Sequence, residues 1–130
     1  QTEDRSSATT PRPFSFAAAL ESLDNDAELL TEQMRFFQND GPQLLQRVQE
    51  AIDQRDARPM EIAAHRLKGL LARYAYHDAA GLAYDLERMG REAEFDPAQA
   101  ACRKLKPLVD LLVNAIDDYV AKYETEKGKW

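Results

Sequence analysis

The chain has 130 residues, enough for one domain with a hydrophobic core and too few for two. Its 44% hydrophobic and 31% charged residues are typical of a globular protein, and the low glycine count with few β-branched runs favours helices over sheet. The net charge of -6 argues against nucleic acid as a partner, because binding a phosphate backbone needs a basic surface, so we expect a protein partner.

The ends of the chain differ from its middle. Residues 1–13 are polar and rich in Ser, Thr and Pro, which predicts a flexible linker or tail, and the chain begins with Gln, as a domain cut from a longer protein would. We expect a helical bundle over 14–124 and a C-terminal tail over 125–130. No apolar stretch is long enough to cross a bilayer, so we expect no direct membrane contact by this domain.

The first half of the chain predicts three helices, over 15–22, 25–38 and 42–55. The first has apolar residues spaced by one turn and is expected to cover one end of the bundle. Asp24 is a possible cap for the second helix. Asp40-Gly41-Pro42 is expected to end the second helix and start the third, since proline is well tolerated at a first helical position.

The second half predicts three more helices. Asp56 can cap a helix that ends near Tyr76, the next helix extends to about Ala93, and the last runs from Asp96 to about residue 123 with a kink at Pro107. All of these helices are amphipathic, and the loops between them are short. The predicted fold class is all-α: an antiparallel four-helix bundle with additional N-terminal helices packed on it.

The fourth of these helices contains a histidine followed four residues later by a glycine. With Met60 as zero and about 100° per residue, the apolar stripe is centred near about 340°, whereas His65 lies near about 140° and Gly69 near about 180°. His65 is therefore predicted to be exposed, with bare backbone beside it. Lys68, at i+3, can reach whatever the imidazole carries, so these residues predict a site for a transferable anionic group.

The stretch from Ala64 to Arg91, AHRLKGLLARYAYHDAAGLAYDLERMGR, resembles the histidine-containing phosphotransfer (HPt) domain. The family pattern is a His, any residue, an apolar residue, Lys, Gly, and then a leucine-rich second helix, to which Leu82, Leu86 and Glu87 correspond. Upstream, the segments 36–40 and 42–52 are similar to the family's first two helices. The resemblance covers most of the chain.

The resemblance implies that His65 is the phosphoacceptor, that Lys68 stabilises the phosphate, and that Gly69 opens the face for docking. It implies a phosphorelay intermediate that accepts a phosphoryl group from a receiver-domain aspartate and passes it to another, a carrier that is not an enzyme. The chain itself is expected to need no cofactor, and the partner receiver is expected to bring the Mg²⁺. A hybrid sensor histidine kinase, which can be membrane-anchored, is the expected parent protein, and the domain is expected in the cytoplasm.

Docking is expected on the exposed shoulder around His65. Ile62, Ala72, Tyr76 and Phe36 join Gly69 as the predicted contacts of response-regulator receiver domains. An exposed phosphoacceptor needs no dimer, so we expect a monomer.

Two departures from the family pattern bear on this interpretation. Leu70 and Leu71 stand where small residues often follow the Lys-Gly pair, and Ala75 stands where a glycine is often found near the helix end. The departures bear on partner choice more than on chemistry. Two alternatives stay open: a helical interaction module that is not phosphorylated, and the phosphoacceptor domain of a chemotaxis-type kinase.

Overall fold

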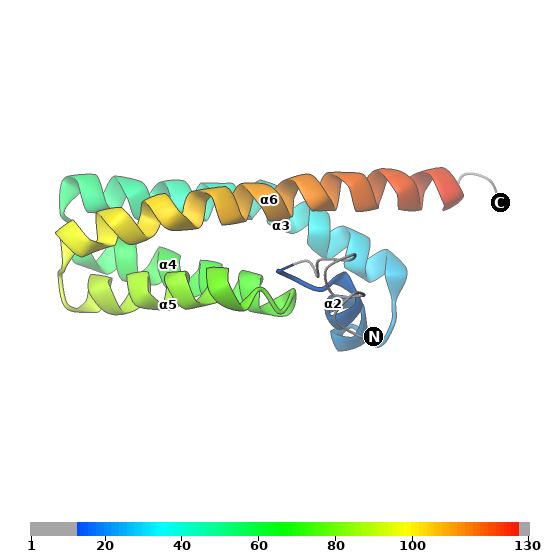
Figure 1. The fold of residues 1–130 in the computed structure, drawn as a ribbon, viewed down its shortest axis with the longest axis horizontal. Helices are drawn as coiled ribbons and strands as arrows, with labels where there is room; N and C mark the ends of the chain where they lie inside the picture. The colour runs from blue at the N-terminus through cyan, green and yellow to red at the C-terminus, as the bar shows by residue number, and fades with distance from the viewer. Residues whose placement is uncertain (1–12, 128–130) are drawn as a thin grey trace, which may run out of the picture.

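The computed structural model describes residues 13–127, which fold into five helices. They are α2 (Phe16–Ser22), α3 (Ala27–Gln54), α4 (Ala57–Arg73), α5 (His77–Arg91) and α6 (Phe95–Lys127). Helices α3 to α6 run antiparallel in a bundle and α2 lies against one end of it (Figure 1). Each bundle helix packs against its two neighbours around the ring, so α4 lies diagonally opposite α6. The predicted fold class is confirmed, with α2 as the one separate additional helix among the described residues.

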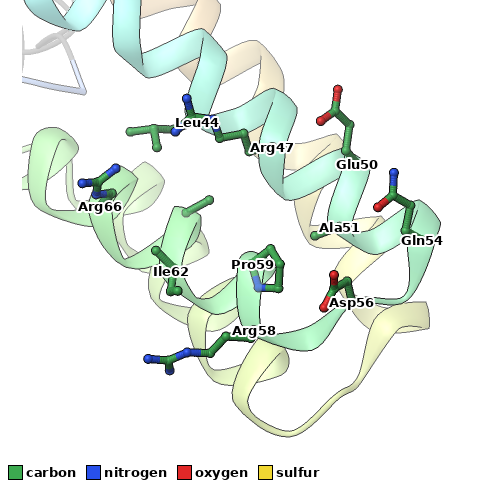
Figure 2. A pocket seen from close by; sticks show the side chains of 11 residues that line it. Leu44, Arg47, Glu50, Ala51, Gln54, Asp56, Arg58, Pro59, Ile62 and Arg66 are labelled. Carbon is green, nitrogen blue, oxygen red and sulfur yellow. The ribbon is translucent and has the colours of Figure 1, made fainter.

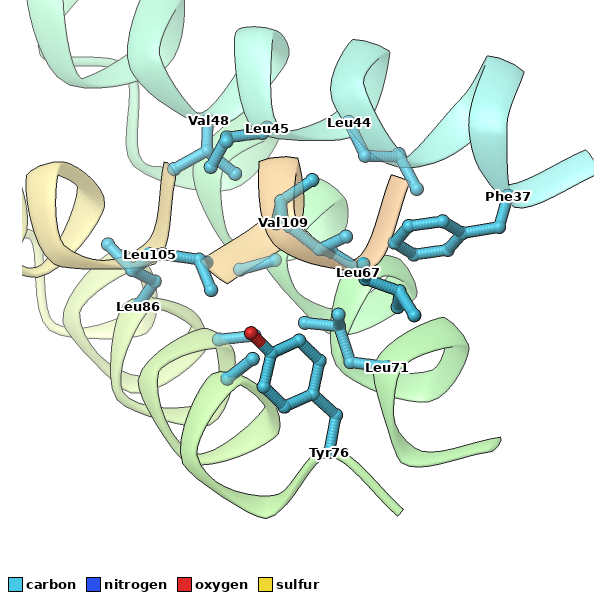
Figure 3. Close-up of a cluster of buried hydrophobic side chains, with 14 of the residues drawn as sticks. Phe37, Leu44, Leu45, Val48, Leu67, Leu71, Tyr76, Leu86, Leu105 and Val109 are labelled. Carbon is cyan, nitrogen blue, oxygen red and sulfur yellow. The ribbon is translucent and has the colours of Figure 1, made fainter. Parts of the chain in front are cut away.

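The core lies along the axis of the bundle and is built from the predicted apolar stripes. Figure 3 shows side chains from α3, α4, α5 and α6 meeting there, with the Tyr76 ring among them. The fully buried large residues come from all four helices: Leu30, Met34, Phe37, Met60, Leu67, Leu71, Leu86, Leu105, Leu112 and Ile116. Burial of these stripes fixes the outward direction of the remaining side chains, including the histidine of α4.

The predicted break at Asp40-Gly41-Pro42 was wrong, because α3 continues through Pro42 as one helix. Apolar residues are buried on both sides of the proline, which offsets the cost of the missing hydrogen bond. Gly41 packs beneath the Phe37 ring: a β-carbon at Gly41 would lie 2.9 Å from Cζ of Phe37. Figure 1 shows the first part of α3 running obliquely to the rest, which fits a bend at the proline.

The helix starts differ in how they are capped. Asp26, and not Asp24 as expected, caps α3, where its Oδ1 accepts from the Leu29 backbone N–H at 3.0 Å. Asp56 occupies the N-cap position of α4 as predicted, although its side chain makes no capping hydrogen bond. The turns after α3, α4 and α5 each contain a residue with positive φ, at 53° for Arg55, 53° for Ala75 and 57° for Ala93. In all three turns a residue other than glycine adopts the left-handed conformation.

Helix α2 covers the end of the bundle, as predicted. The Ser15 backbone N–H donates to the Tyr74 carbonyl at 2.7 Å, which ties α2 to the end of α4. The Phe16 ring packs edge-on against Tyr74 and Tyr119, with centroids 6.0 and 5.3 Å apart. The aromatic cluster joins the N-terminal helix to α4 and α6.

Helix α6 continues through Pro107 and extends to Lys127, beyond the expected end near residue 123. Over residues 13–127 no helix is both long and apolar enough to cross a membrane. The predicted N-terminal tail, apart from residue 13, lies outside the described residues, as do residues 128–130.

Candidate functional site

The site is centred on His65, in the middle of α4. The buried residues of this helix are Met60, Ala63, Ala64, Leu67 and Leu71. His65 lies on the opposite side, and its side chain is 65% exposed. The helical periodicity of the sequence predicted this exposure correctly.

Gly69 leaves the backbone open one turn after His65. A β-carbon built at Gly69 would meet nothing within 4 Å, whereas one at Gly90 would lie 2.7 Å from the Glu61 backbone nitrogen. No packing inside the domain therefore requires a glycine at position 69, although glycine costs about 1 kcal/mol relative to alanine within a helix. The bare backbone beside the imidazole is therefore better explained by the approach of a partner molecule to His65 than by packing within the domain.

Glu87, on α5, organises the site. Its Oε2 lies 3.0 Å from His65 Nδ1, and its Oε1 accepts from Lys68 Nζ at 2.8 Å. Arg91 approaches the same carboxylate at 3.4 Å, and the Glu87 side chain is only 10% exposed. The hydrogen bond from Lys68 lowers the pKa of the Glu87 carboxyl; burial opposes that effect, and the contact with His65 adds to it. Glu87 is thus a carboxylate at neutral pH.

The carboxylate determines which nitrogen of His65 can react. A carboxylate only accepts hydrogen bonds, so Nδ1 carries the proton and donates to Glu87. When the ring is neutral, the lone pair therefore lies on Nε2, the nitrogen away from Glu87, and Nε2 is the nucleophile.

The close approach of α4 and α5 brings Glu87 to His65. Gly90 lies one turn after Glu87 and touches the Glu61 backbone, one turn before His65. Arg91 also reaches across to Glu61, with Nε 3.3 Å from Oε2. The family resemblance matches Glu87 to the second helix of the pattern but does not place it in the site. A signal for this role was present in the sequence, since Glu87 is a glutamate on the buried side of α5, beside Ala83 and Leu86.

Lys68 lies where the sequence predicted, on the flank of α4 next to His65. In this structure it is held by Glu87, and its Nζ is 5.4 Å from the centroid of the exposed Tyr84 ring. Because Glu87 contacts both Lys68 and His65, the ammonium is close to any group attached to the imidazole. The lysine can therefore neutralise part of a phosphoryl charge.

The expected docking residues are mostly exposed. Phe36 and Ile62 are 48% and 45% exposed, and Ala72 and Gly69 are also on the surface. Phe36 lines the same groove between α3 and α4 as His65 and Gly69. Ile62 lies in the adjoining part of that groove (Figure 2).

Tyr76 was predicted to lie on the docking surface, and this prediction was wrong. The Tyr76 side chain is fully buried, and its hydroxyl donates to the Leu108 carbonyl at 2.8 Å. The ring packs against Phe14 with centroids 5.1 Å apart. The turn after α4 directs this side chain into the core, which the helical wheel of α4 could not show.

Leu70 and Leu71 leave His65 accessible, as expected. Leu71 is in the core, and Leu70 is partly buried along the groove. Among the described side chains, no group of three His, Cys, Asp or Glu residues lies together in a way that could hold a metal ion.

The exposed mid-helix histidine of this four-helix bundle, with a carboxylate on Nδ1 and an adjacent lysine, is consistent with a protein that carries a phosphoryl group on histidine. The family model of the Hpt domain matches residues 32–119. The chain belongs to the Hpt domain family, and its function is histidine phosphotransfer in a relay.

A solved structure shares most of this architecture. The crystal structure of histidine-containing phosphotransfer protein B (HptB) from Pseudomonas aeruginosa PAO1 is similar with a TM-score of 0.79 and 17% identity, over 88% of this chain and 99% of that chain. At this identity the similarity shows a common fold. No curated protein matches the chain.

Proposed function

We propose that His65 is the phosphoacceptor of this Hpt domain and that it exchanges a phosphoryl group with aspartates of receiver domains. The observation that carries this proposal is the 3.0 Å contact between His65 Nδ1 and the Glu87 carboxylate, with Nε2 left facing solvent. It supports a histidine whose neutral form reacts without a separate base, since Nδ1 then carries the ring proton and Nε2 the lone pair.

The transfer breaks one bond and forms one. The Nε2 lone pair attacks phosphorus in the aspartyl phosphate of the receiver, an N–P bond forms, and the P–O bond to the aspartate breaks, which releases a carboxylate. The proton stays on Nδ1, so the ring becomes positively charged as the N–P bond forms. The Glu87 carboxylate stabilises that charge, and Lys68 offsets the phosphoryl charge.

The return step uses the same groups. A phosphorylated ring that remains protonated on Nδ1 is a good leaving group, so a second receiver aspartate can take the phosphoryl group and regenerate neutral His65. We expect the receiver to supply the Mg²⁺ for both steps, because phosphoryl transfer depends on positioning and charge stabilisation. On this proposal the domain is a carrier, with no hydrolytic or kinase activity of its own.

Docking uses the exposed Phe36, Ile62, Gly69 and Ala72 around His65. One exposed phosphoacceptor suffices for transfer, so the domain works as a monomer. It acts in the cytoplasm, together with receiver domains, as part of a sensor kinase or beside one.

The test is transfer of label from phosphorylated receiver domains to this chain. We expect acid-labile label on the parent and on His77→Gln, and none on His65→Gln. His77 is the matched control, since it is an exposed histidine at the first residue of α5, away from the Glu87 contact. Binding of receivers without any labelling of the parent would instead indicate an interaction module.

A further inference from the structure

A groove runs along the surface between α3 and α4 and extends well beyond His65. Its near half is lined by Phe36, His65, Gly69 and Arg73 among others. Its distal half, of about 350 Å³, is lined by residues that include Ala51, Pro59 and Ile62. Leu44, Arg47 and Arg66 line both halves, so the two form one continuous α3/α4 groove.

Three arginines in this groove have no ion-pair or hydrogen-bond partner among the described residues. Arg47, Arg66 and Arg73 form no ion pair or side-chain hydrogen bond over residues 13–127. Most other arginines in that range do form ion pairs, namely Arg35, Arg55, Arg58, Arg88 and Arg91. The contrast matters because the whole chain carries a net charge of -6. The groove concentrates unpaired positive charge on an acidic protein.

Acidic residues do not cancel this charge in the near half of the groove, next to His65. Among the described residues, Asp40 is the only carboxylate that lines the near half, where it faces the charge of three arginines. In the distal half, Glu50 and Asp56 lie toward the far end, while Arg47 and Arg66 lie nearer the middle (Figure 2). The part of the groove next to the phosphoacceptor is therefore basic.

The surface of the distal half beside Arg47 and Arg66 is mainly apolar. Leu44 and Ala51 of α3 face Pro59 and Ile62 of α4 across the distal half (Figure 2). Such a surface fits an apolar side chain of a partner, and a guanidinium at its edge fits a neighbouring carboxylate, which it can bind through two parallel hydrogen bonds.

We propose that the α3/α4 groove selects among receiver domains, and favours those that present an apolar side chain flanked by carboxylates. This inference rests on the proposed function, because it takes the partner to be a receiver. Pro59 and Ile62 lie three to six residues before His65, about 5 to 9 Å along the helix axis. Contacts in the distal half therefore affect the rate and the affinity of receiver binding, while phosphoryl transfer takes place at His65.

The test uses charge reversal with a matched control. The variant Arg47→Glu/Arg66→Glu reverses the charge at the junction of the two halves. The control Arg103→Glu reverses an exposed arginine on α6, the helix diagonally opposite α4. Transfer to each protein is measured from a set of phosphorylated receivers with acidic or basic docking faces, over a range of receiver concentration and of NaCl. Phosphoramidate, a small donor that needs no docking, reports the reactivity of His65 in each variant, and receiver rates are normalised to it.

We expect the groove variant to have a KM for acidic receivers about tenfold higher than that of the parent at low salt, with a smaller change in the saturating rate. This difference in KM should shrink at high salt. The control should stay within about twofold of the parent. An equal KM for the groove variant and the control, or an effect that is the same for acidic and basic receivers, would overturn the inference while leaving the proposed function intact. Failure of phosphoramidate and of every receiver to label the parent on His65 would overturn the proposed function itself.

Discussion

Nδ1 of His65 on α4 lies 3.0 Å from Oε2 of Glu87 on α5, and the other oxygen of the same carboxylate accepts from Lys68 at 2.8 Å. The reactive group is therefore held by a contact between two helices that are separate in the sequence. Because the carboxylate is nearly buried, the contact is protected from the screening that weakens exposed ion pairs.

Glu87→Gln should slow transfer to and from receivers. The amide cannot stabilise positive charge on the ring, and it can donate to Nδ1 as well as accept, so the proton is no longer confined to Nδ1. We expect the transfer rate to fall by about tenfold to a hundredfold, and ¹⁵N NMR of His65 to show a mixture of tautomers. Unchanged tautomer signals together with a full rate would show that Glu87 does not position the imidazole.

The Glu87 carboxylate should make the stability of the domain depend on pH. Its pKa is lower in the folded protein than the ordinary value of 4.5, chiefly through the hydrogen bond from Lys68. The unfolded chain thus binds this proton more tightly, so the stabilisation is present above about pH 4.5 and is lost as the pH falls through the folded pKa. Urea unfolding at a series of pH values should show that the free energy of unfolding falls more steeply toward acid pH for the parent than for Glu87→Gln. Parallel curves would contradict this account.

Gly69→Ala and Gly81→Ala should separate stability from function. Both glycines are exposed within helices, and a β-carbon at either would meet no atom within 4 Å. Each substitution should raise the free energy of unfolding by up to about 1 kcal/mol. Only Gly69→Ala should slow transfer from receivers, by about tenfold or more, because the added methyl occupies the approach to His65. Equal transfer rates for the two variants would show that Gly69 has no role in docking.

Ala75→Gly should stabilise the domain. Ala75 follows α4 with φ of 53°, a conformation that glycine adopts without the steric cost of a β-carbon. We expect a gain of about 1 kcal/mol in urea unfolding, and a similar gain for Ala93→Gly, with φ of 57°. Ala72→Gly, an exposed position inside α4, is the control and should lose about 1 kcal/mol. A loss for Ala75→Gly as well would contradict the conformational explanation.

The two buried tyrosines should respond differently to loss of their hydroxyl groups. Burial raises the pKa of each to about 12, but the Tyr76 hydroxyl donates to Leu108, whereas the Tyr74 hydroxyl has no hydrogen-bond partner in the described part of the chain. Tyr76→Phe should therefore cost about 1 kcal/mol, and Tyr74→Phe should be neutral or stabilising by about 1 kcal/mol. Thermal unfolding of both variants provides the comparison, and a large loss for Tyr74→Phe would reveal a partner for that hydroxyl.

Local patterns in the sequence predicted much of the fold. The spacing of Leu67 and Leu71 gave α4 one buried side, and the exposure of His65 followed from that spacing, since helical geometry fixes directions within one helix. The same reasoning failed at Gly41-Pro42, where burial on both sides of the proline outweighed a local signal for a break. It also failed at Tyr76, because the direction of a side chain in a turn depends on the path of the chain.

The sequence by itself determined the helical bundle, the exposed histidine and the open glycine beside it, because each depends on residues within a few turns of one another. Only the tertiary structure decided that Glu87 meets His65 and that Arg47 and Arg66 share a groove. Those relationships depend on the register between neighbouring helices. At the α4–α5 interface that register follows from the close contact of Gly90 with the Glu61 backbone. Pairing across helices is set by how their surfaces pack together, which no periodicity within a single helix encodes.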